Sequence, residues 1–482
     1  MSQGKVYLVG AGPGDETLIT LKGKNVLEKA DVILYDRLIN PMLLQYATDR
    51  CEFIYCGKLP DRHILRQEKI NQLLVHYANL GKIVVRLKGG DPSVFGRVGE
   101  EAYELASHNI SFEIVPGITS GIAAPSYSGI PVTHREYGES FAIITAHNKS
   151  STGKPKIDWK SLSNGIDTLA FYMGIANLPY ICESLLKHGK PADTPVILIQ
   201  WGTMGKQKTL QGTLATIAKK AEKADIRNPA ITLVGNIIEL REKINWFEKK
   251  PLFGRQILLA QSSIYRNKLA AQLRELGADV VEIPKLKKIS EMTKIKQTIL
   301  SKIEKYETFI FTSLEATEQF FLDLLSEKID IRSIKARFYS INEEVLVELT
   351  KRGFTATGLD RINSHENMLI IGENKDAING ELYATHRVAI DSRFDQIYRR
   401  LVEETNYDTI IFPTHLSVNL FNDYVNTLLN CGDSFYNEKQ VISIGDETFI
   451  EAKRNNISSK RIPNNININV LQEYFIHHTE TK

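Results

Sequence analysis

Short apolar runs that each end in a polar, glycine-containing loop constrain the fold of this chain most strongly. Four such runs, at 6–9, 32–35, 83–87 and 112–115, alternate with segments of helical character, the first from about Leu18 to Ala30. This alternation predicts an α/β fold with a mainly parallel sheet. Ligands bind beyond the carboxyl ends of the strands in such sheets. We therefore expect the four loops to form one shared site.

The loop after the third run, residues 87–101 (LKGGDPSVFGRVGEE), carries the most chemistry. Its two glycines let the backbone approach a ligand closely. Asp91 before Pro92 predicts a helix N-cap followed by a proline at the first helical position. Arg97 and Glu100 are three residues apart, which predicts an ion pair on one helix face. An ordinary strand–turn–helix junction is the alternative for this loop alone, and the other loops argue against it.

Length, charge and cysteine content exclude several classes of protein. The chain has 482 residues, enough for roughly three domains. Its 60 Lys plus Arg nearly balance its 57 Asp plus Glu, which does not suggest a nucleic-acid partner. The four cysteines are scattered and predict reduced thiols, and the histidines show no metal-ligand spacing. With no apolar run of membrane-spanning length and no signal-peptide pattern, we expect a cytoplasmic protein that binds neither membrane nor metal.

A second α/β unit is expected to begin near Ser140 and to close with a short helix to about Asn245. Its predicted strands are residues 142–146, 168–173, 196–200 and 230–234. The segment 246–254 (WFEKKPLFG) contains Pro and Gly and is predicted to be a linker. The predicted domains are therefore residues 1–246 and 251–482.

The C-terminal domain contains an internal repeat. The sequence at 308–313 (TFIFTS) is echoed at 409–414 (TIIFPT), and 339–344 (YSINEE) is echoed at 442–447 (ISIGDE). Order and spacing both repeat, so two copies of a strand–helix–strand–helix unit are expected to form two similar lobes.

The loop Gly10–Asp15 does not support a dinucleotide site. Its glycines are spaced G-x-G-P-G, without the third glycine of the dinucleotide fingerprint. Pro13 would also disturb a helix start that binds pyrophosphate.

Seven motifs in the N-terminal half, taken together, resemble the uroporphyrinogen-III C-methyltransferases. They are VYLVGAGPGD at 6–15, YDRL at 35–38, CGK at 56–58, RLKGGDPSVFGR at 86–97, VPGITSGIAAPSYSGIPVTHR at 115–135, YMG at 172–174 and GTL at 212–214. The resemblance implies a two-lobed tetrapyrrole-methylase fold and a homodimer. It also implies transfer of methyl groups from S-adenosylmethionine to two pyrrole carbons of uroporphyrinogen III, giving precorrin-2 for sirohaem or cobalamin.

The resemblance also implies roles for individual residues. Asp36 matches the proton acceptor and Lys58 the proton donor, while Arg37, Arg97, Glu100 and Arg135 match residues for substrate binding or proton removal. The positions that match cofactor contacts are Pro13, Gly89, Gly90, Asp91, Val94, Thr119, Ser120, Met173 and Gly202. The substrate carries eight carboxylates, which suits the planar forks of arginine. His147 and Trp201 depart from the family's usual sequence.

The C-terminal half resembles uroporphyrinogen-III synthases, although its motifs are fewer. They are GRQILL at 254–259, LRELGADVVEIPKL at 273–286, FTS at 311–313, Gly372 after an apolar run, and IGDE at 444–447. The resemblance implies a two-lobed α/β domain with a two-strand hinge, which closes hydroxymethylbilane with inversion of the last pyrrole. Thr312, Ser313 and Tyr398 are its candidate substrate-binding residues. The second repeat has Phe-Pro-Thr where Phe-Thr-Ser is usual.

Two other functions remain open from the sequence. The C-terminal half is either a synthase or an inactive scaffold that binds tetrapyrrole or promotes dimerisation, and the altered Phe-Pro-Thr motif keeps the second possibility. The methylase substrate is uroporphyrinogen III, a later corrin intermediate or a protein side chain. The YDRL, CGK and THR motifs favour uroporphyrinogen III.

Overall fold

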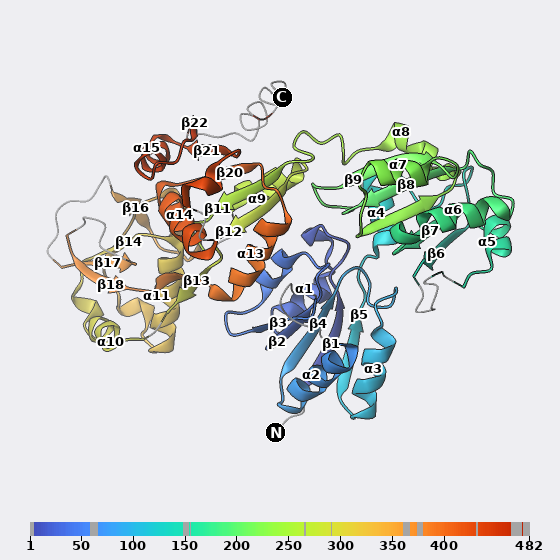
Figure 1. The fold of residues 1–482 in the computed structure, drawn as a ribbon. Coiled ribbons are helices and arrows are strands. Elements are labelled where there is room, and N and C mark those ends of the chain that lie inside the picture. The colour runs from blue at the N-terminus through green and yellow to red at the C-terminus, as the bar shows by residue number, and fades with distance from the viewer. Residues whose placement is uncertain are drawn as a thin grey trace. The chain divides into compact units, whose positions relative to one another are not determined.

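The computed structural model describes residues 4–57, 66–147, 154, 156–264, 267–290, 292–359, 367–373, 379–429, 432–463 and 475. The chain divides into two compact units. The first comprises Met1–Gln261, Arg266–Ile283 and Arg393–Lys482, and the second comprises Ser262–Tyr265 and Pro284–Ser392. Most helices and strands of each unit are labelled in Figure 1.

The first sheet is entirely parallel, as the alternating pattern predicts. Its strands, in spatial order, are β3 (Glu52–Tyr55), β2 (Val32–Tyr35), β4 (Ile83–Lys88), β1 (Lys5–Gly10) and β5 (Ser111–Val115). Its helices are α1 (Leu21–Leu27), α2 (Gln67–Asn79), α3 (Val98–Ser107) and α4 (Ser120–Tyr127). The central strands are mainly apolar because both of their faces are largely buried, although β4 also carries Arg86 and Lys88.

The prediction of a helix that starts at Pro92 is wrong. Asp91 instead accepts a hydrogen bond from the backbone N–H of Ser93 at 2.7 Å, which closes a turn. The helix α3 begins at Val98, because Phe95 and Arg97 adopt left-handed backbone conformations that no α-helix continues.

The second sheet is mixed and follows the order β6–β7–β10–β8–β9. Its strands are β6 (Phe141–Thr145), β7 (Thr168–Tyr172), β8 (Pro195–Gln200), β9 (Lys208–Thr213) and β10 (Ala230–Val234). Four of them confirm the predicted strands, whereas β9 was not foreseen. Only the β6–β7 pair is parallel. Its helices are α5 (Trp159–Gly165), α6 (Leu178–Lys187), α7 (Ile217–Lys223) and α8 (Arg241–Ile244).

The segment predicted to be a linker, residues 246–254, contains no helix or strand. It is nevertheless well packed, since Phe247 and Leu252 are buried. Leu252 belongs to the hydrophobic core of the lobe that follows. The segment 246–254 is therefore packed against the rest of the protein and is not a solvated linker.

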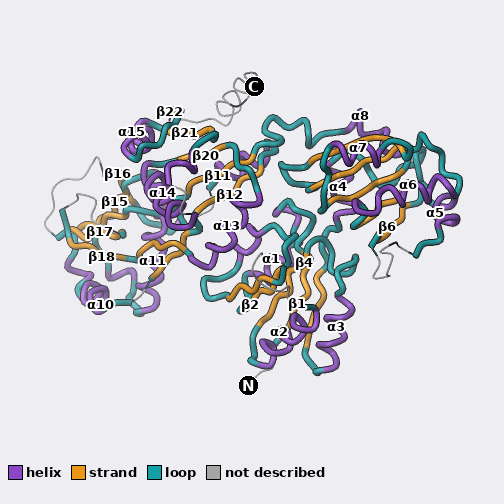
Figure 2. Tube along the Cα trace, in the orientation of Figure 1, coloured by secondary structure: helices purple, strands orange, loops and turns teal. Residues whose placement is uncertain are grey.

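The C-terminal half confirms the predicted repeat. One copy runs β14 (Thr308–Phe311), α11 (Leu314–Ser326), β15 (Arg337–Ser340), α12 (Glu343–Lys351) and β16 (Ala356–Gly358). The other runs β20 (Thr409–Phe412), α14 (His415–Leu429), β21 (Gln440–Ile444), α15 (Asp446–Arg454) and β22 (Lys460–Ile462). Figure 2 shows the alternation of strand and helix in both copies.

Each copy is completed by two further strands. The first copy adds β17 (Met368–Gly372) and β18 (Glu381–Ala384), and the second adds β11 (Gln256–Ala260) and β12 (Asp279–Ile283). The remaining helices are α9 (Lys268–Glu275), α10 (Lys294–Ser301) and α13 (Asp395–Glu404). The chain passes between the lobes through an antiparallel pair, β13 (Leu286–Ile289) and β19 (Arg387–Ile390), as the two-strand hinge predicts.

Candidate active site

Four glycines bring the carboxyl ends of β1, β4 and β5 into direct backbone contact. A Cβ atom on Gly10 would lie 2.6 Å from the backbone of Gly117, and one on Gly117 would lie 2.3 Å from the carbonyl oxygen of Gly90. Gly12 and Gly90 pair through two backbone hydrogen bonds, of 3.2 and 2.7 Å. Only residues without a side chain permit this approach. The expected clustering of these polar loops is therefore confirmed.

Asp91 ties two of these loops together. One carboxylate oxygen accepts from Ser93 N–H, and the other accepts from Gly117 N–H at 2.9 Å. Beside this tie, Gly90 has a left-handed φ of 69°. The nearest atoms to a Cβ placed there would be Ser120 N and Thr119 Cα at 3.9 Å, so Gly90 lies against the N-terminus of α4 without crowding it.

The second lobe contributes Tyr172, at the end of β7. Its hydroxyl lies 2.5 Å from Thr119 Oγ1 and accepts from the N–H of Gly121. Met173 follows with a left-handed φ of 55° and an exposed side chain. The structure therefore brings Thr119 and Ser120 to the end of the strand that leads into Met173, as the shared-site expectation requires.

Gly202 and Pro13 lie on loops that contact each other. A Cβ on Gly14, next to Pro13, would lie 3.1 Å from the carbonyl oxygen of Gly202. Gly202 itself packs against α4, because a Cβ there would lie 2.4 Å from Cβ of Ala124. Pro13, Gly89, Gly90, Asp91, Thr119, Ser120, Met173 and Gly202 thus come from loops linked by direct contacts, and Val94 follows Asp91 in the turn that Asp91 begins.

A buried charge network leads to Asp36, which follows β2. Arg86 donates to Asp36 Oδ1 at 2.5 Å and to Glu101 Oε1 at 3.1 Å. Lys88 donates to the same Glu101 oxygen at 2.9 Å. Arg86, Lys88 and Glu101 are buried, whereas a third of the Asp36 side chain is exposed. Asp36 is therefore the member of this network that a ligand can reach.

Burial shapes the ionisation of this region. The pKa of Lys88 is lowered, first by burial and then by the Arg86 charge, although Glu101 acts in the opposite direction. Burial likewise raises the pKa of the Cys56 thiol to about 11. Arg86 and Glu101 are not among the site residues predicted from the sequence. The available signal was a pair of cations, Arg86 and Lys88, at alternate positions of an otherwise apolar strand.

The other polar residues predicted for the substrate lie on separate segments. Arg97 donates to Glu100 through Nε at 2.8 Å, so the predicted ion pair forms, and both side chains are exposed. The predicted shared helix face is wrong, because Arg97 precedes α3 in a left-handed conformation. Arg37 lies 3.4 Å from Glu404, and Arg135 is exposed in the turn that His134 and Gly138 close. Lys58 lies outside the described residues.

The candidate residues of the C-terminal half lie in different lobes. Thr312 directly follows β14, and its hydroxyl donates to the carbonyl of Ile371. Ser313 caps α11 by accepting from the N–H of Ala316. Tyr398, on α13, is fully buried and donates to the carbonyl of Glu282 at 2.9 Å. The substrate roles of all three stay predictions.

Among the described residues no three or more His, Cys, Asp or Glu side chains cluster in a way that could hold a metal ion. Within the same ranges, no helix has both the length and the apolar character of a membrane span.

Two family models match the chain. Residues 5–218 match the tetrapyrrole (corrin/porphyrin) methylases, and residues 267–369 match the uroporphyrinogen-III synthase HemD family.

Relatives with curated names are uroporphyrinogen-III C-methyltransferases and siroheme synthases. A uroporphyrinogen-III C-methyltransferase of Bacillus subtilis (strain 168) is 49% identical over 424 residues, which is 87% of this chain and 87% of the relative. Another, of Priestia megaterium, is 60% identical over 235 residues, which is 49% of this chain and 98% of the relative. The siroheme synthase of Pseudomonas fluorescens (strain SBW25) is 48% identical over 51% of this chain, which spans about half (52%) of that enzyme.

Solved structures also resemble the chain. The uroporphyrin-III C-methyl transferase of Thermus thermophilus, complexed with S-adenyl homocysteine, is 36% identical over 49% of this chain and 100% of its own, with a TM-score of 0.43.

Proposed function

This chain belongs to the uroporphyrinogen-III C-methyltransferase family, and we propose that its N-terminal half methylates two pyrrole carbons of uroporphyrinogen III to give precorrin-2. The observation that carries the proposal is the 49% identity to the Bacillus subtilis enzyme over 87% of both chains. The enzyme is a tetrapyrrole methyltransferase. We place its two domains at residues 1–246 and 251–482. A cytoplasmic homodimer is part of the same proposal and is supported by the family resemblance.

S-adenosylmethionine is the methyl donor, and when bound it supplies a methyl group already activated by a sulfonium. We assign its binding to Pro13, Gly89, Gly90, Asp91, Val94, Thr119, Ser120, Met173 and Gly202. The position beside Gly90, at the α4 N-terminus, suits such a ligand, because the loops that carry the assigned residues meet there. Calorimetry is expected to show binding of S-adenosylmethionine and none of NAD, and the reverse would overturn the assignment.

Substrate binding is assigned to arginines. Guanidinium groups bind carboxylates in a planar two-point geometry, and the substrate carries eight carboxylates. Arg37, Arg97 and Arg135 are exposed and therefore accessible to such a ligand, and Glu100 lies within reach of Arg97. Correct positioning of donor and pyrrole carbon supplies much of the acceleration.

Proton transfer is assigned to Asp36 as acceptor and Lys58 as donor, with Arg97 as a further participant. Methylation makes the pyrrole carbon quaternary, so a proton must leave a neighbouring position, and a base there assists. Asp36 suits this role because its carboxylate is partly exposed and fixed by Arg86. Replacement of Asp36 by Asn is expected to lower turnover far more than cofactor affinity. An unchanged rate would remove Asp36 from the mechanism.

We further propose that the C-terminal half makes uroporphyrinogen III from hydroxymethylbilane. The match to the synthase family over residues 267–369 and the confirmed two-lobe repeat support this activity. The full chain should be incubated with hydroxymethylbilane in the absence of S-adenosylmethionine. An excess of the type III isomer is expected, since uncatalysed closure gives type I. Only type I product from a folded chain would favour the scaffold alternative. Adding S-adenosylmethionine, with products identified by mass and absorbance, then tests the methylase on the same sample.

A further inference from the structure

The loop 201–206, which carries Gly202, has a conformation that needs external support. Trp201 has a φ of 51° and Thr203 a φ of 73°, both in the left-handed region. Such conformations cost free energy in residues other than glycine and persist where surrounding structure imposes them. The contacts of this loop therefore show what determines its shape.

Part of the support comes from the N-terminal half. The side chain of Gln207 accepts from Thr203 N–H at 2.9 Å, and the hydroxyl of Thr203 accepts from Asp15 N–H at 3.0 Å. A Cβ on Gly14 would lie 2.7 Å from Cγ of Met204. The glycine loop after β1 and the loop 201–206 thus stabilise each other's conformation.

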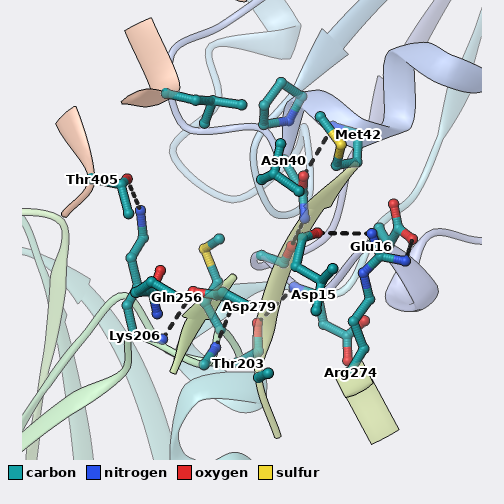
Figure 3. Close-up of a pocket in the computed structure, with 18 of the residues that line it drawn as sticks. Asp15, Glu16, Asn40, Met42, Thr203, Lys206, Gln256, Arg274, Asp279 and Thr405 are labelled. Atoms are coloured by element: carbon teal, nitrogen blue, oxygen red, sulfur yellow. Dashed lines mark hydrogen bonds and ion pairs between the residues drawn. The ribbon is translucent and has the colours of Figure 1, made fainter. Parts of the chain in front are cut away.

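The other support comes from the C-terminal half, through Asp279 at the start of β12. Its two carboxylate oxygens accept separately from Gly205 N–H at 2.8 Å and Lys206 N–H at 2.9 Å. Gly205 permits this approach, because a Cβ there would lie 2.5 Å from the backbone nitrogen of Asp279. Burial raises the pKa of Asp279, whereas the two backbone N–H groups and the charge of Lys206 act in the opposite direction. Figure 3 shows Asp279 beside Thr203 and Lys206.

The pocket in Figure 3 is lined by residues of both the N-terminal and the C-terminal half of the chain. Its charged side chains form ion pairs or hydrogen bonds. Arg274 lies 3.5 Å from Glu16 of the N-terminal half and 3.1 Å from Glu282 of its own lobe. The ammonium of Lys206 reaches Thr405 at 3.4 Å. None of the residues assigned to the cofactor lines this pocket.

We propose that Asp279 is a positioning residue of the methylase, which holds the loop 201–206 in the shape that binds the cofactor. The proposal rests on the proposed function, because it takes Gly202 as a cofactor contact. It gives the C-terminal half a role in methyl transfer that is independent of synthase activity. The carboxylate fixes the backbone on one side of the loop while Asp15 and Gln207 fix Thr203 on the other.

The test uses the full chain and S-adenosylhomocysteine as the probe. Replacing Asp279 by Ala removes both acceptors and is expected to weaken binding in calorimetry about tenfold. Asp279→Asn keeps one acceptor oxygen and is expected to fall between Ala and wild type. The KM for S-adenosylmethionine should rise, turnover at saturating cofactor should change little, and the isomer ratio from hydroxymethylbilane should stay the same.

Asp408→Ala is the matched control. Asp408 accepts a backbone N–H, that of Gln256, in the same lobe and pairs with Arg255 at 3.5 Å. Its loss is expected to leave S-adenosylhomocysteine affinity unchanged. Unchanged affinity in Asp279→Ala, or an equal loss in Asp408→Ala, would overturn the positioning role. Failure of the wild-type chain to bind the probe would instead overturn the proposed function.

Discussion

Arg86 donates to Asp36 at 2.5 Å while its Nε donates to the buried Glu101 at 3.1 Å. The carboxylate of Asp36, assigned as proton acceptor, is thus oriented by the guanidinium of Arg86. That guanidinium is in turn oriented by Glu101. One side of Asp36 is therefore committed to the protein, and its exposed part faces outward.

Replacing Arg86 by Lys tests this positioning. An ammonium cannot reproduce the planar fork that reaches Asp36 and Glu101 together, so Asp36 should lose its orientation. Turnover is expected to fall about tenfold to a hundredfold, because small misplacements of reacting groups cost rate factors of this size. Cofactor affinity, measured by calorimetry, should not change. Wild-type turnover would show that Asp36 needs no support from Arg86.

Glu101 and its neighbour Glu100 form a natural pair for a stability comparison. Glu101 is buried against Arg86 and Lys88, and its replacement by Ala would leave two buried cations without their shared partner. A loss of about 3–5 kcal/mol is expected in urea unfolding of the N-terminal half. Glu100→Ala, which breaks an exposed pair, should cost no more than about 1 kcal/mol. Equal effects would contradict the assigned importance of the buried network.

Arg97→Lys is expected to lose most methyl-transfer activity, because lysine cannot make a two-point contact with a substrate carboxylate. Arg227→Lys is the control, since Arg227 also forms an exposed ion pair, with Asp225 at 2.8 Å. Steady-state kinetics should show a higher KM for uroporphyrinogen III only in Arg97→Lys. If both variants behave like wild type, Arg97 does not bind substrate.

The regular elements were predictable from the sequence where apolar runs and glycines are decisive. The strands β1, β2, β4 and β5 and both copies of the repeat follow directly from such patterns. The start of α3 was not predictable, because the Asp91-Pro92 pair carries a helix-start signal that the left-handed Phe95 and Arg97 override. The strand β9 (Lys208–Thr213) was missed because it is polar and only partly buried.

Part of the candidate site was likewise predictable from the sequence, and part was not. The meeting of the glycine loops follows from parallel strands, whose carboxyl ends share one edge. The network around Arg86 joins three separate segments, and the contact of Asp279 with Gly205 joins residues 74 positions apart. Long-range side-chain partners of this kind depend on tertiary packing, which local sequence patterns do not specify.

The thiols give a prediction about pH. Burial raises the pKa of Cys51 to about 12 and those of Cys56 and Cys182 to about 11, from an ordinary value of 9.0. A raised folded-state pKa contributes stability that is full below the unfolded-state value and is lost as the pH rises through the folded value. Unfolding free energy should therefore decline between about pH 9 and 12. Thiolates are the reactive form, so these three thiols should react with a disulfide reagent at pH 8 only after unfolding in urea. Rapid labelling of the native chain at all three would contradict their burial.

The central claim is methyl transfer to uroporphyrinogen III, and the most direct measurement counts the methyl groups that this substrate receives. Purified full-length chain, uroporphyrinogen III as the only tetrapyrrole, and S-adenosylmethionine with an isotopically labelled methyl group should be analysed by mass spectrometry under anaerobic conditions. Two labelled methyl groups per tetrapyrrole are expected, with an absorbance matching precorrin-2. An unlabelled tetrapyrrole recovered from a folded, cofactor-binding chain would contradict the account.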